Sequence, residues 1–420
     1  MTTALAYSDA RGRVYFDAHR EPLADGGILR APLAGELIPA PPATVLAQLP
    51  SRAPFVAGKK VAVRRTALAA LLPAGYTRLL LPAYRSGPEA PALGLFGYTF
   101  VCAVDGALHV AALRTDRSED WKPRTFASGE LERIIEARRA TDRQNRVLDQ
   151  LELCSREYGC FTAQNVFLMR GEAALPVSPK CNARCVACIS ELEPEAGIPS
   201  PQVRIGYEAT PDELARIALF HLARVRDGIV SFGQGCEGEP LLRTTTIART
   251  IERIRASTSR GTLNLNTNGS LPASLRSLID AGLDAVRISL NSFRTQPYAA
   301  YYRPSGYGLD EVLESARSAA QAGLRVSLNY LTHPGVSDER LEIEAAESFL
   351  SGVRVEMIQT RALNIDPERY FALVGRPREP LGMRTALQRL AATGARLGNF
   401  THRRAIAPLR ARAVEPVTPD

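Results

Sequence analysis

The sequence predicts an α/β protein in which a β-rich α+β unit precedes a run of parallel β/α units. Two observations carry this prediction. Short β-type runs separated by Pro- and Gly-rich connectors fill the first 125 residues, whereas strand and helix signals alternate between residues 171 and 370. Such alternation is typical of parallel β/α units. About six units can be counted, fewer than the eight of a closed barrel.

Four segments are expected along the chain: an N-terminal β-rich domain, a helical connector with two helices, a β/α domain, and a C-terminal helix followed by a disordered tail. Their boundaries are 1–125, 126–170, 171–370 and 371–420. In the first segment, strands are expected at 14–16, 60–65 and 78–81 and in a hairpin of residues 98–113. The hairpin is the clearest of these, because Asp105-Gly106 suits the left-handed dihedrals of a tight turn.

The β/α region has regular strand and helix signals. One helix should begin at Thr210-Pro211-Asp212-Glu213, a capping box with proline at the first helical position. Further helices are expected at 244–255, 273–281, 310–322, 338–350 and 384–397. Strands are expected at 174–177, 229–232, 263–265, 285–288, 325–328 and 353–358.

Three cysteines, Cys181, Cys185 and Cys188, follow the first of these strands in a C-x3-C-x2-C pattern. Loop cysteines this close together can converge on one soft inorganic centre, and thiolate is the ligand that iron–sulfur clusters select. Three thiolates would leave one iron of a four-iron cube open to a small molecule. The alternative is structural zinc, which normally takes four ligands. No second CxxC or HxxxH supports it, so a cluster is preferred.

This cysteine pattern resembles the hallmark of the radical S-adenosylmethionine (SAM) superfamily, and the resemblance covers roughly the second half of the chain. It implies a partial (β/α)6 barrel, a [4Fe-4S] cluster on Cys181, Cys185 and Cys188, and SAM chelated to the open iron. One position departs from the family pattern. The residue before the last cysteine is usually aromatic there, whereas here it is Ala187.

Later motifs are similar to those of molybdopterin-biosynthesis-type members. They lie where strands end, which is where chemistry gathers in parallel β/α architectures. Glu237-Gly238-Glu239-Pro240 resembles the Gly-Gly-Glu-Pro motif that receives the SAM amino group, with Glu237 in place of the first glycine. A carboxylate such as Glu239 can accept hydrogen bonds from an ammonium. The alternative for such a loop is a simple turn.

The third and fourth strands end in motifs similar to Thr-Asn-Gly and Ser-Leu-Asp-Ser, and Asn291 replaces the acid of the second. The resemblance therefore implies SAM contacts at Gly238, Glu239, Thr267, Asn268, Ser289 and Asn291. Alternation along the third strand would aim Asn266 and Asn268 to one side, and Asn329 lies on the fifth strand, so Asn266 and Asn329 are further candidate SAM contacts. Gln359 and Arg361, on the sixth strand, are further candidates to point inward. For each, the competing interpretation is an ordinary polar strand end.

The connection after the fourth strand interleaves tyrosines with arginines. Its members are Arg294, Tyr298, Tyr301, Tyr302, Arg303 and Tyr307. Such side chains can stack on a planar substrate or clamp an anionic one. Packing beneath neighbouring helices explains them equally well, so the two interpretations stay open.

Composition narrows the class of protein. The chain has 420 residues, seven cysteines and a formal net charge of +8. It shows no signal-peptide pattern and no bilayer-spanning apolar run, so a cytoplasmic protein without membrane insertion is expected. A nucleic-acid partner is possible but not favoured, because no dense basic run occurs. Cys102, Cys154, Cys160 and Cys236 have no spacing that supports a second cluster, and Cys154 lies in an apolar helical stripe.

The sequence thus predicts a radical SAM enzyme whose catalytic residues and substrate stay unidentified. An external electron donor of flavodoxin or ferredoxin type would drive reductive cleavage of SAM to a 5′-deoxyadenosyl radical. That radical would abstract hydrogen from a small molecule or peptide, and the protein would orient the reactants and exclude competing reactions. The alternatives are an RNA-modifying radical SAM enzyme and a zinc-stabilised binding module.

Overall fold

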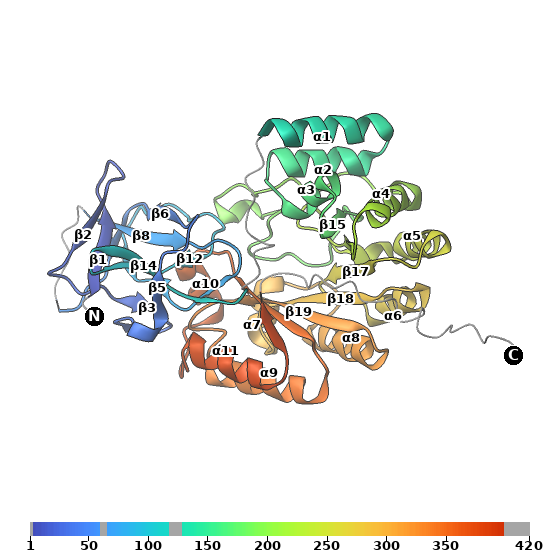
Figure 1. Ribbon diagram of the computed structural model, residues 1–420. Coiled ribbons are helices and arrows are strands. Elements are labelled where there is room, and N and C mark those ends of the chain that lie inside the picture. Colours follow the sequence, from blue (N-terminus) through green and yellow to red (C-terminus); the bar gives the residue numbers. More distant parts are fainter. Residues whose placement is uncertain (1–2, 59–64, 117–127, 399–420) are drawn as a thin grey trace, which may run out of the picture.

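The computed structural model describes residues 3–58, 65–116 and 128–398. It contains an antiparallel N-terminal unit, a group of three helices and a parallel sheet (Figure 1). None of the helices in these ranges is long and apolar enough to cross a membrane. The predicted strand 60–65 falls almost wholly outside these ranges, as do the tail after residue 398 and the expected boundary at residue 125.

The N-terminal unit is built on a nine-stranded sheet in which every pairing is antiparallel. Its strands are β1 (Thr3–Ser8), β2 (Val14–Asp17), β5 (Leu37–Pro39), β6 (Val45–Leu49), β8 (Thr66–Leu71), β9 (Tyr76–Arg78), β12 (Tyr98–Thr99), β13 (Val101–Val104) and β14 (Ala107–Arg114). Two small sheets lie beside it, one of β3 (Ala24–Asp25), β4 (Leu29–Arg30) and β10 (Leu81–Pro82), the other of β7 (Arg52–Pro54) and β11 (Tyr84–Ser86).

The predicted hairpin is present. Val104 pairs with Ala107, and the turn residues Asp105 and Gly106 have φ of 50° and 79°, as a tight hairpin turn requires. The strand expected at 78–81 is wrong as a single element. It straddles the end of β9 and the start of β10, which pair with different neighbours.

Three helices follow, α1 (Ser128–Thr141), α2 (Arg146–Arg156) and α3 (Phe161–Leu168). The apolar periodicity predicted the first two. Helix α3 was missed because its eight residues are too few to display a helical period. In Figure 1 these helices lie above β15, and α3 packs directly on that strand.

The parallel sheet has seven strands in sequence order, one more than the six expected. They are β15 (Glu172–Leu175), β16 (Ile229–Phe232), β17 (Thr262–Thr267), β18 (Ala285–Leu290), β19 (Arg325–Thr332), β20 (Met357–Ala362) and β21 (Arg396–Gly398). The additional strand, β21, occupies the end of the predicted helix 384–397. The prediction for β20 began four residues early, because Val353 and Val355 are buried in the connection before the strand.

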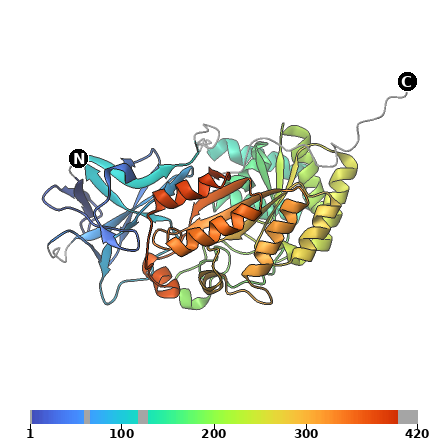
Figure 2. The ribbon, with the colours of Figure 1, turned by 90° about the horizontal axis from the view of Figure 1, so that it is seen from below.

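Helices cover the sheet on its outer face, as Figures 1 and 2 show from two directions. They are α4 (Pro211–Arg224), α5 (Thr244–Ser257), α6 (Pro272–Ala281), α8 (Leu309–Gln321), α9 (Arg340–Gly352) and α11 (Met383–Ala392). The predicted capping box opens α4, where the Thr210 hydroxyl accepts from Glu213 N and the Glu213 carboxylate accepts from Thr210 N. Two unpredicted short helices, α7 (Thr295–Tyr302) and α10 (Pro367–Val374), follow the carboxyl ends of β18 and β20.

Arg78 connects the N-terminal unit to the carboxyl ends of β19 and β20. Its guanidinium is 1% exposed and donates to Thr332 O at 3.3 Å, Leu363 O at 2.8 Å and Tyr98 O at 3.2 Å. Desolvation lowers the pKa of Arg78 to about 9. Beside it, the Thr77 and Thr360 hydroxyls are 2.6 Å apart. The two β structures therefore share a buried polar contact close to the strand ends where a site is expected.

Replacing Arg78 with alanine should lower the midpoint of thermal unfolding strongly. The change removes three hydrogen bonds from a charged donor and leaves buried carbonyls without partners, at about 1–3 kcal/mol for each. The control is Arg317→Ala, since that half-exposed side chain pairs only with Glu314 on the helix surface and should cost less than about 1 kcal/mol. Equal shifts for the two variants in a thermal melt would contradict a connecting role for Arg78.

Candidate functional site

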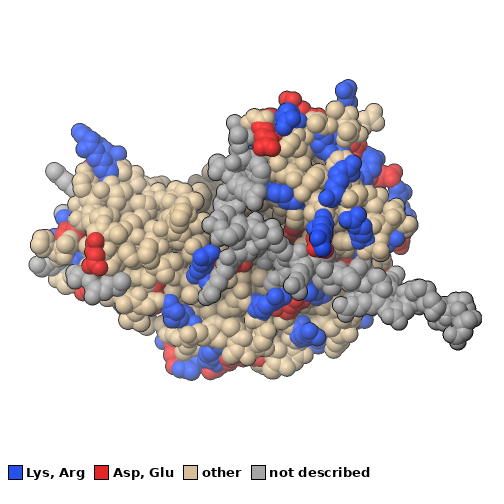
Figure 3. Space-filling view, in the orientation of Figure 1, with Lys and Arg blue, Asp and Glu red and all other residues tan. Residues whose placement is uncertain are grey.

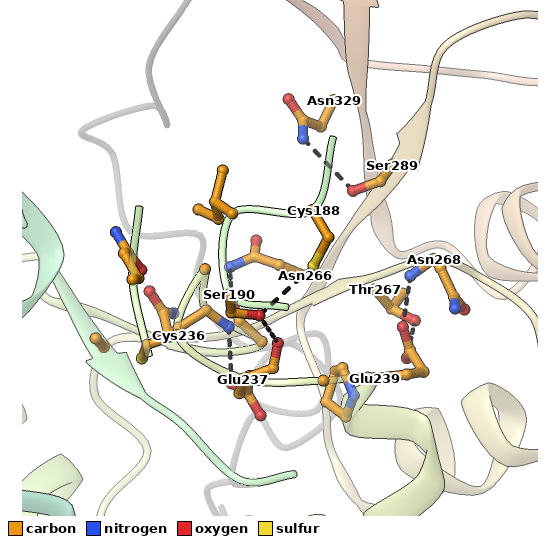
Figure 4. Close-up of a pocket in the computed structure, with 18 of the residues that line it drawn as sticks. Cys188, Ser190, Cys236, Glu237, Glu239, Asn266, Thr267, Asn268, Ser289 and Asn329 are labelled. Carbon is orange, nitrogen blue, oxygen red and sulfur yellow. Dashed lines mark hydrogen bonds between the residues drawn. The ribbon is translucent and has the colours of Figure 1, made fainter. Parts of the chain in front are cut away.

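A cavity of about 470 Å³ lies at the carboxyl ends of the parallel strands. Side chains from six strands or the loops after them line it, together with two parts of the α2–α3 region. The lining includes most of the residues singled out in the sequence: Cys181, Cys185, Cys188, Gly238, Glu239, Asn266, Thr267, Asn268, Ser289, Asn329, Gln359 and Arg361. Figure 4 shows several of them converging from the strand ends.

Cys181, Cys185 and Cys188 lie on the loop after β15, and their sulfurs are near enough to influence one another's ionisation. Burial raises the pKa of Cys181 to about 11 and that of Cys185 well above the usual range, and neighbouring thiolates add to both. Arg204 Nη2 lies 3.5 Å from the Cys188 sulfur. Three thiolates at this spot therefore need a cationic centre between them, which suits a metal cluster.

Single-ion coordination has no support in the geometry. Within residues 3–58, 65–116 and 128–398, no group of three or more His, Cys, Asp or Glu side chains is arranged to hold one metal ion. A cube of four irons is larger than one ion and accepts more widely spaced sulfurs. The donor set, three thiolates in an enclosed cavity, fits an iron–sulfur cluster.

Helix α7 holds the cysteine loop through backbone hydrogen bonds. Val186 N donates to Tyr301 O at 3.0 Å, and Arg184 N donates to Tyr302 O at 3.1 Å. Tyr298, Tyr301 and Tyr302 are each less than 5% exposed, and the Tyr298 and Tyr302 rings stack with centroids 4.6 Å apart. Of the two interpretations of this segment, packing is the one these contacts support, although Tyr302 also lines the cavity.

Gly238 brings the loop after β16 against the cysteine loop. Gly238 N donates to Ser178 O at 2.7 Å, and Glu239 N donates to Lys180 O at 2.8 Å. A Cβ at Gly238 would lie 2.0 Å from Lys180 O, so only glycine fits. The close approach is therefore to the backbone before Cys181, whereas the sequence suggested an approach to a ligand.

Glu237, the departure from the Gly-Gly-Glu-Pro pattern, ties together the ends of β15 and β16. Its carboxylate accepts from Val177 N, Ser178 N and Gln234 N, each at 2.7 Å. Burial raises the pKa of Glu237 to about 8, while these three N–H donors oppose the rise by stabilising the charged form. No role for this side chain was predicted from the sequence.

Glu239 uses its carboxylate within the protein. It accepts from Leu241 N at 2.9 Å, Asn268 N at 2.8 Å and the Thr267 hydroxyl, as the dashed lines to Thr267 and Asn268 in Figure 4 show. Burial raises the pKa of Glu239 to about 7. The carboxylate thus shapes the wall formed by the end of β17, and the acceptor role toward an ammonium remains a prediction.

The asparagines at the end of β17 also bond to protein groups. Asn266 Nδ2 donates to Gly233 O at 2.7 Å, and Asn268 Nδ2 donates to Asn182 Oδ1 at 2.8 Å on the cysteine loop. Their alternation along the strand predicted a shared direction, but the sequence could not name these partners. They connect β17 to the loops on either side of it.

Asn291 is the expected SAM contact that the structure places elsewhere. It is fully buried, is absent from the cavity lining, and donates to Pro297 O and the Tyr370 hydroxyl, each at 3.1 Å. Since β18 ends at Leu290, Asn291 has already turned away from the strand face that Ser289 shares with the cavity. Its Oδ1 has no hydrogen-bond partner among the described residues, and its role as a cofactor contact stays a prediction.

Several buried polar atoms along the cavity have no hydrogen-bond partner among the described residues. They are Asn329 Oδ1, both amide atoms of Gln359 and the Tyr302 hydroxyl. Asn329 Nδ2 does reach the Ser289 hydroxyl at 3.4 Å. Unpaired buried amides cost free energy unless a ligand or water completes them. The wall formed by β18, β19 and β20 is therefore suited to a polar ligand.

Sequence reasoning missed further residues of this cavity. Arg287 bonds to Asn266 Oδ1 at 2.8 Å and to the Glu172 carboxylate at 3.3 Å. Nothing distinguishes Arg287 from the many other arginines of the chain until the sheet places it. Cys154, Cys160 and Cys236 also line the cavity, which their distant positions in the sequence did not indicate.

A sequence profile of the Radical SAM superfamily matches residues 175–345. The chain is 28% identical over 240 residues to the FeMo cofactor biosynthesis protein NifB of Klebsiella pneumoniae, covering 53% of this chain and 49% of that protein. It is 30% identical over 198 residues to GTP 3′,8-cyclase of Heliobacterium modesticaldum, covering 46% and 56% respectively. The chain thus spans about half the length of these curated relatives.

Similarity to solved structures is weaker. A radical SAM methyltransferase from Sphaerobacter thermophilus matches with a TM-score of 0.39 and 18% identity, over 54% of this chain and 64% of that one. The crystal structure of methylornithine synthase matches with a TM-score of 0.35 and 13% identity, over 65% and 78%.

Gly238→Ala should abolish iron binding by the cysteine loop, because the added Cβ would displace the Lys180 carbonyl next to Cys181. The matched control is Gly206→Ala, a loop glycine whose Cβ would meet nothing within 4 Å. Both variants should keep the secondary structure of the wild type in circular dichroism. Absorbance of the reconstituted protein, compared before and after desalting, measures the cluster. A Gly238→Ala protein as brown and as active in SAM cleavage as the control would refute the proposed close fit.

Proposed function

Because residues 175–345 belong to the radical SAM superfamily, we propose that this chain is an enzyme that binds a [4Fe-4S] cluster through Cys181, Cys185 and Cys188. With an electron from an external donor, a cluster held there would supply the reductive cleavage of SAM, and the 5′-deoxyadenosyl radical formed would abstract hydrogen from the substrate. One observation supports this proposal most strongly: the three thiols and the strand-end motifs line the same cavity. The zinc-stabilised module is disfavoured by the family match.

The parallel sheet is the partial barrel that this proposal needs. Strands β15 to β20 and their helices would form the (β/α)6 core, with the SAM site at their carboxyl ends. We also propose the four-part division at residues 125, 170 and 370. The N-terminal unit is then attached close to the carboxyl ends of β19 and β20, where Arg78 and Thr77 bond, while the cavity lining itself comes from residues 151–361.

Two sets of residues would position SAM. Gly238, Glu239, Thr267 and Asn268 fix the backbone around the cluster loop, as their hydrogen bonds indicate, while Asn266 connects that wall to β16. Ser289 and Asn329 offer a hydroxyl and an unpaired carbonyl oxygen toward the cavity. Polar groups of this kind suit the hydroxyls and amino acid portion of SAM.

We propose a small anionic substrate for the remaining part of the cavity, next to β20. Arg361 lines the cavity; its backbone carbonyl accepts from the Thr332 hydroxyl, but its guanidinium forms no hydrogen bond or ion pair with any described residue. Arg287 repels its charge, while Glu172 and Asp116 attract it. Since Glu172 already bonds to Arg287 and to the Ser231 hydroxyl, the Arg361 guanidinium is left for a carboxylate or phosphate of the substrate.

RNA is the less suitable substrate class. On the face shown in Figure 3, basic side chains on the helical half of the molecule are interspersed with acidic ones. Many arginines of the described residues are also paired with carboxylates, as in Arg253–Asp212 and Arg389–Glu347. A phosphate backbone would need a continuous basic surface. An external flavodoxin- or ferredoxin-type donor remains the proposed source of the electron.

Reduced, anaerobically reconstituted protein should convert SAM to 5′-deoxyadenosine, and alanine at Cys181, Cys185 or Cys188 should abolish that conversion because each removes a thiolate of the cluster. Cys102→Ala is the matched control, since Cys102 is buried in the N-terminal unit away from the cavity. Chromatography of the quenched reaction measures SAM and 5′-deoxyadenosine. Undiminished 5′-deoxyadenosine from a Cys185→Ala protein would end the proposal.

Arg361→Gln should weaken binding of inorganic pyrophosphate, used as an anionic probe of the cavity. A charged hydrogen bond contributes about 1.5–3 kcal/mol, which corresponds to roughly a ten- to hundred-fold rise in Kd. Isothermal titration measures this, with Arg317→Gln on the outer helix surface as the control. The anionic-substrate assignment is wrong if the wild type and both variants bind pyrophosphate equally. That result would not bear on the separate proposal that the protein cleaves SAM.

A further inference from the structure

Three cysteines outside the radical SAM motif meet in the same cavity. Cys154 belongs to α2, Cys160 precedes the first residue of α3, and Cys236 lies on the loop after β16. Cys154 and Cys236 are 2% and 4% exposed, and Cys160 is half-buried. Since these elements are far apart in sequence, only the fold brings their thiols together.

Two of the three thiols contact each other, and two lie next to polar side chains. The Cys236 and Cys154 sulfurs are within hydrogen-bonding reach, and the charge of Cys160 is felt at Cys236. Gln150 Nε2 donates to the Cys154 sulfur at 3.3 Å, and the Cys160 sulfur lies 3.3 Å from the Thr162 hydroxyl. Side-chain donors to sulfur are what tunes and orients thiolate ligands in iron–sulfur sites.

Backbone and side-chain bonds hold this arrangement in place. Cys160 N donates to Cys154 O at 3.0 Å, which fixes the two cysteines of the α2–α3 turn relative to each other. The Thr162 hydroxyl donates to Gln234 Oε1 at 3.0 Å and so connects α3 to the loop that carries Cys236. The cluster of thiols therefore lies on a braced framework, as a preformed metal site requires.

Core packing accounts for this group only in part. Cys154 and Cys236 belong to the apolar core around the parallel sheet, and Cys160 packs against that core. All three also line the cavity, which contains Arg204 and Glu172, whereas Cys102 lies among apolar side chains of the N-terminal unit and lines no part of it. Three thiols on the wall of one cavity have the composition of a ligand set.

We propose that Cys154, Cys160 and Cys236 hold a second iron–sulfur cluster in the cavity shared with Cys181, Cys185 and Cys188. Apart from Cys181, Cys185 and Cys188, the cavity lining offers these three thiolates no fourth Cys or His, which matches an iron–sulfur cluster with one open position better than a structural zinc site, since zinc takes four ligands. The open position would face the cavity. This proposal is independent of SAM cleavage, because it concerns metal content alone.

The test is metal analysis of full-length protein reconstituted anaerobically with iron and sulfide. A variant with alanine at Cys181, Cys185 and Cys188 isolates the second site, and one with serine at Cys154, Cys160 and Cys236 isolates the first. If both sites hold cubes, the wild type should contain about eight irons and eight sulfides per chain, and each triple variant about four. Cys102→Ala should match the wild type, and removal of all six cysteines should leave no iron.

Electron paramagnetic resonance of the reduced proteins gives a second measurement, which uses the wild type and so does not depend on how a triple variant folds. Two signals are expected, of which SAM perturbs one, and Cys160→Ser should alter the other. The proposal is overturned if the variant lacking Cys181, Cys185 and Cys188 keeps wild-type circular dichroism but binds no iron, or if it binds zinc without sulfide. A single wild-type signal unaffected by Cys160→Ser, or a Cys154–Cys236 disulfide found by mass spectrometry in place of iron, would overturn it too.

Discussion

The site depends on one contact, the attachment of the loop after β16 to the chain that leaves β15. Glu237 accepts the N–H groups of Val177 and Ser178, and Gly238 donates to Ser178 O. These bonds use the backbone groups that β15 leaves unpaired at its end, and they fix where the cysteine loop begins. Because a Cβ at Gly238 would overlap Lys180 O, the attachment admits no other residue there. The start of the cysteine loop is thus set by the loop after β16, and α7 holds the loop further along through Tyr301 O and Tyr302 O.

The sequence predicted the order of the β/α units and the residues at the strand ends, because both follow from local pattern. Hydrophobic runs and the Thr210–Glu213 capping box report on their own neighbourhood. The predicted site residues, apart from Asn291, line one cavity for the same reason: parallel strands end on the same side. Asn291 lies apart from that lining because a single residue beyond the end of β18 is enough to turn a side chain into the core.

What the sequence did not predict depends on contacts between distant segments. Glu237 looked like a defect in a glycine motif, and only its three N–H donors, two of them about sixty residues away, show why a carboxylate stands there. The sequence around the tyrosines of α7 does not distinguish stacking on a ligand from packing in the core. Their burial in the structure favours packing. Cys154 fits an apolar helical stripe and also lines a cavity, because one helix face can do both.

The cavity is chemically divided, and the division follows the sheet. Thiols and their donors gather where β15 and β16 meet α2 and α3, whereas Arg287, Gln359 and Arg361 lie on β18 and β20. The thiols on one side would hold a metal centre, because they are soft, electron-donating ligands. The cationic and amide groups on the other side would hold an anionic substrate opposite it. A radical formed between them would be enclosed by both walls, and the enclosure matters because exclusion of water and side reactions is the protein's part in such chemistry. The N-terminal unit lies outside this lining, but Arg78 attaches it to the ends of β19 and β20, on the side of the cavity where Arg361 lies.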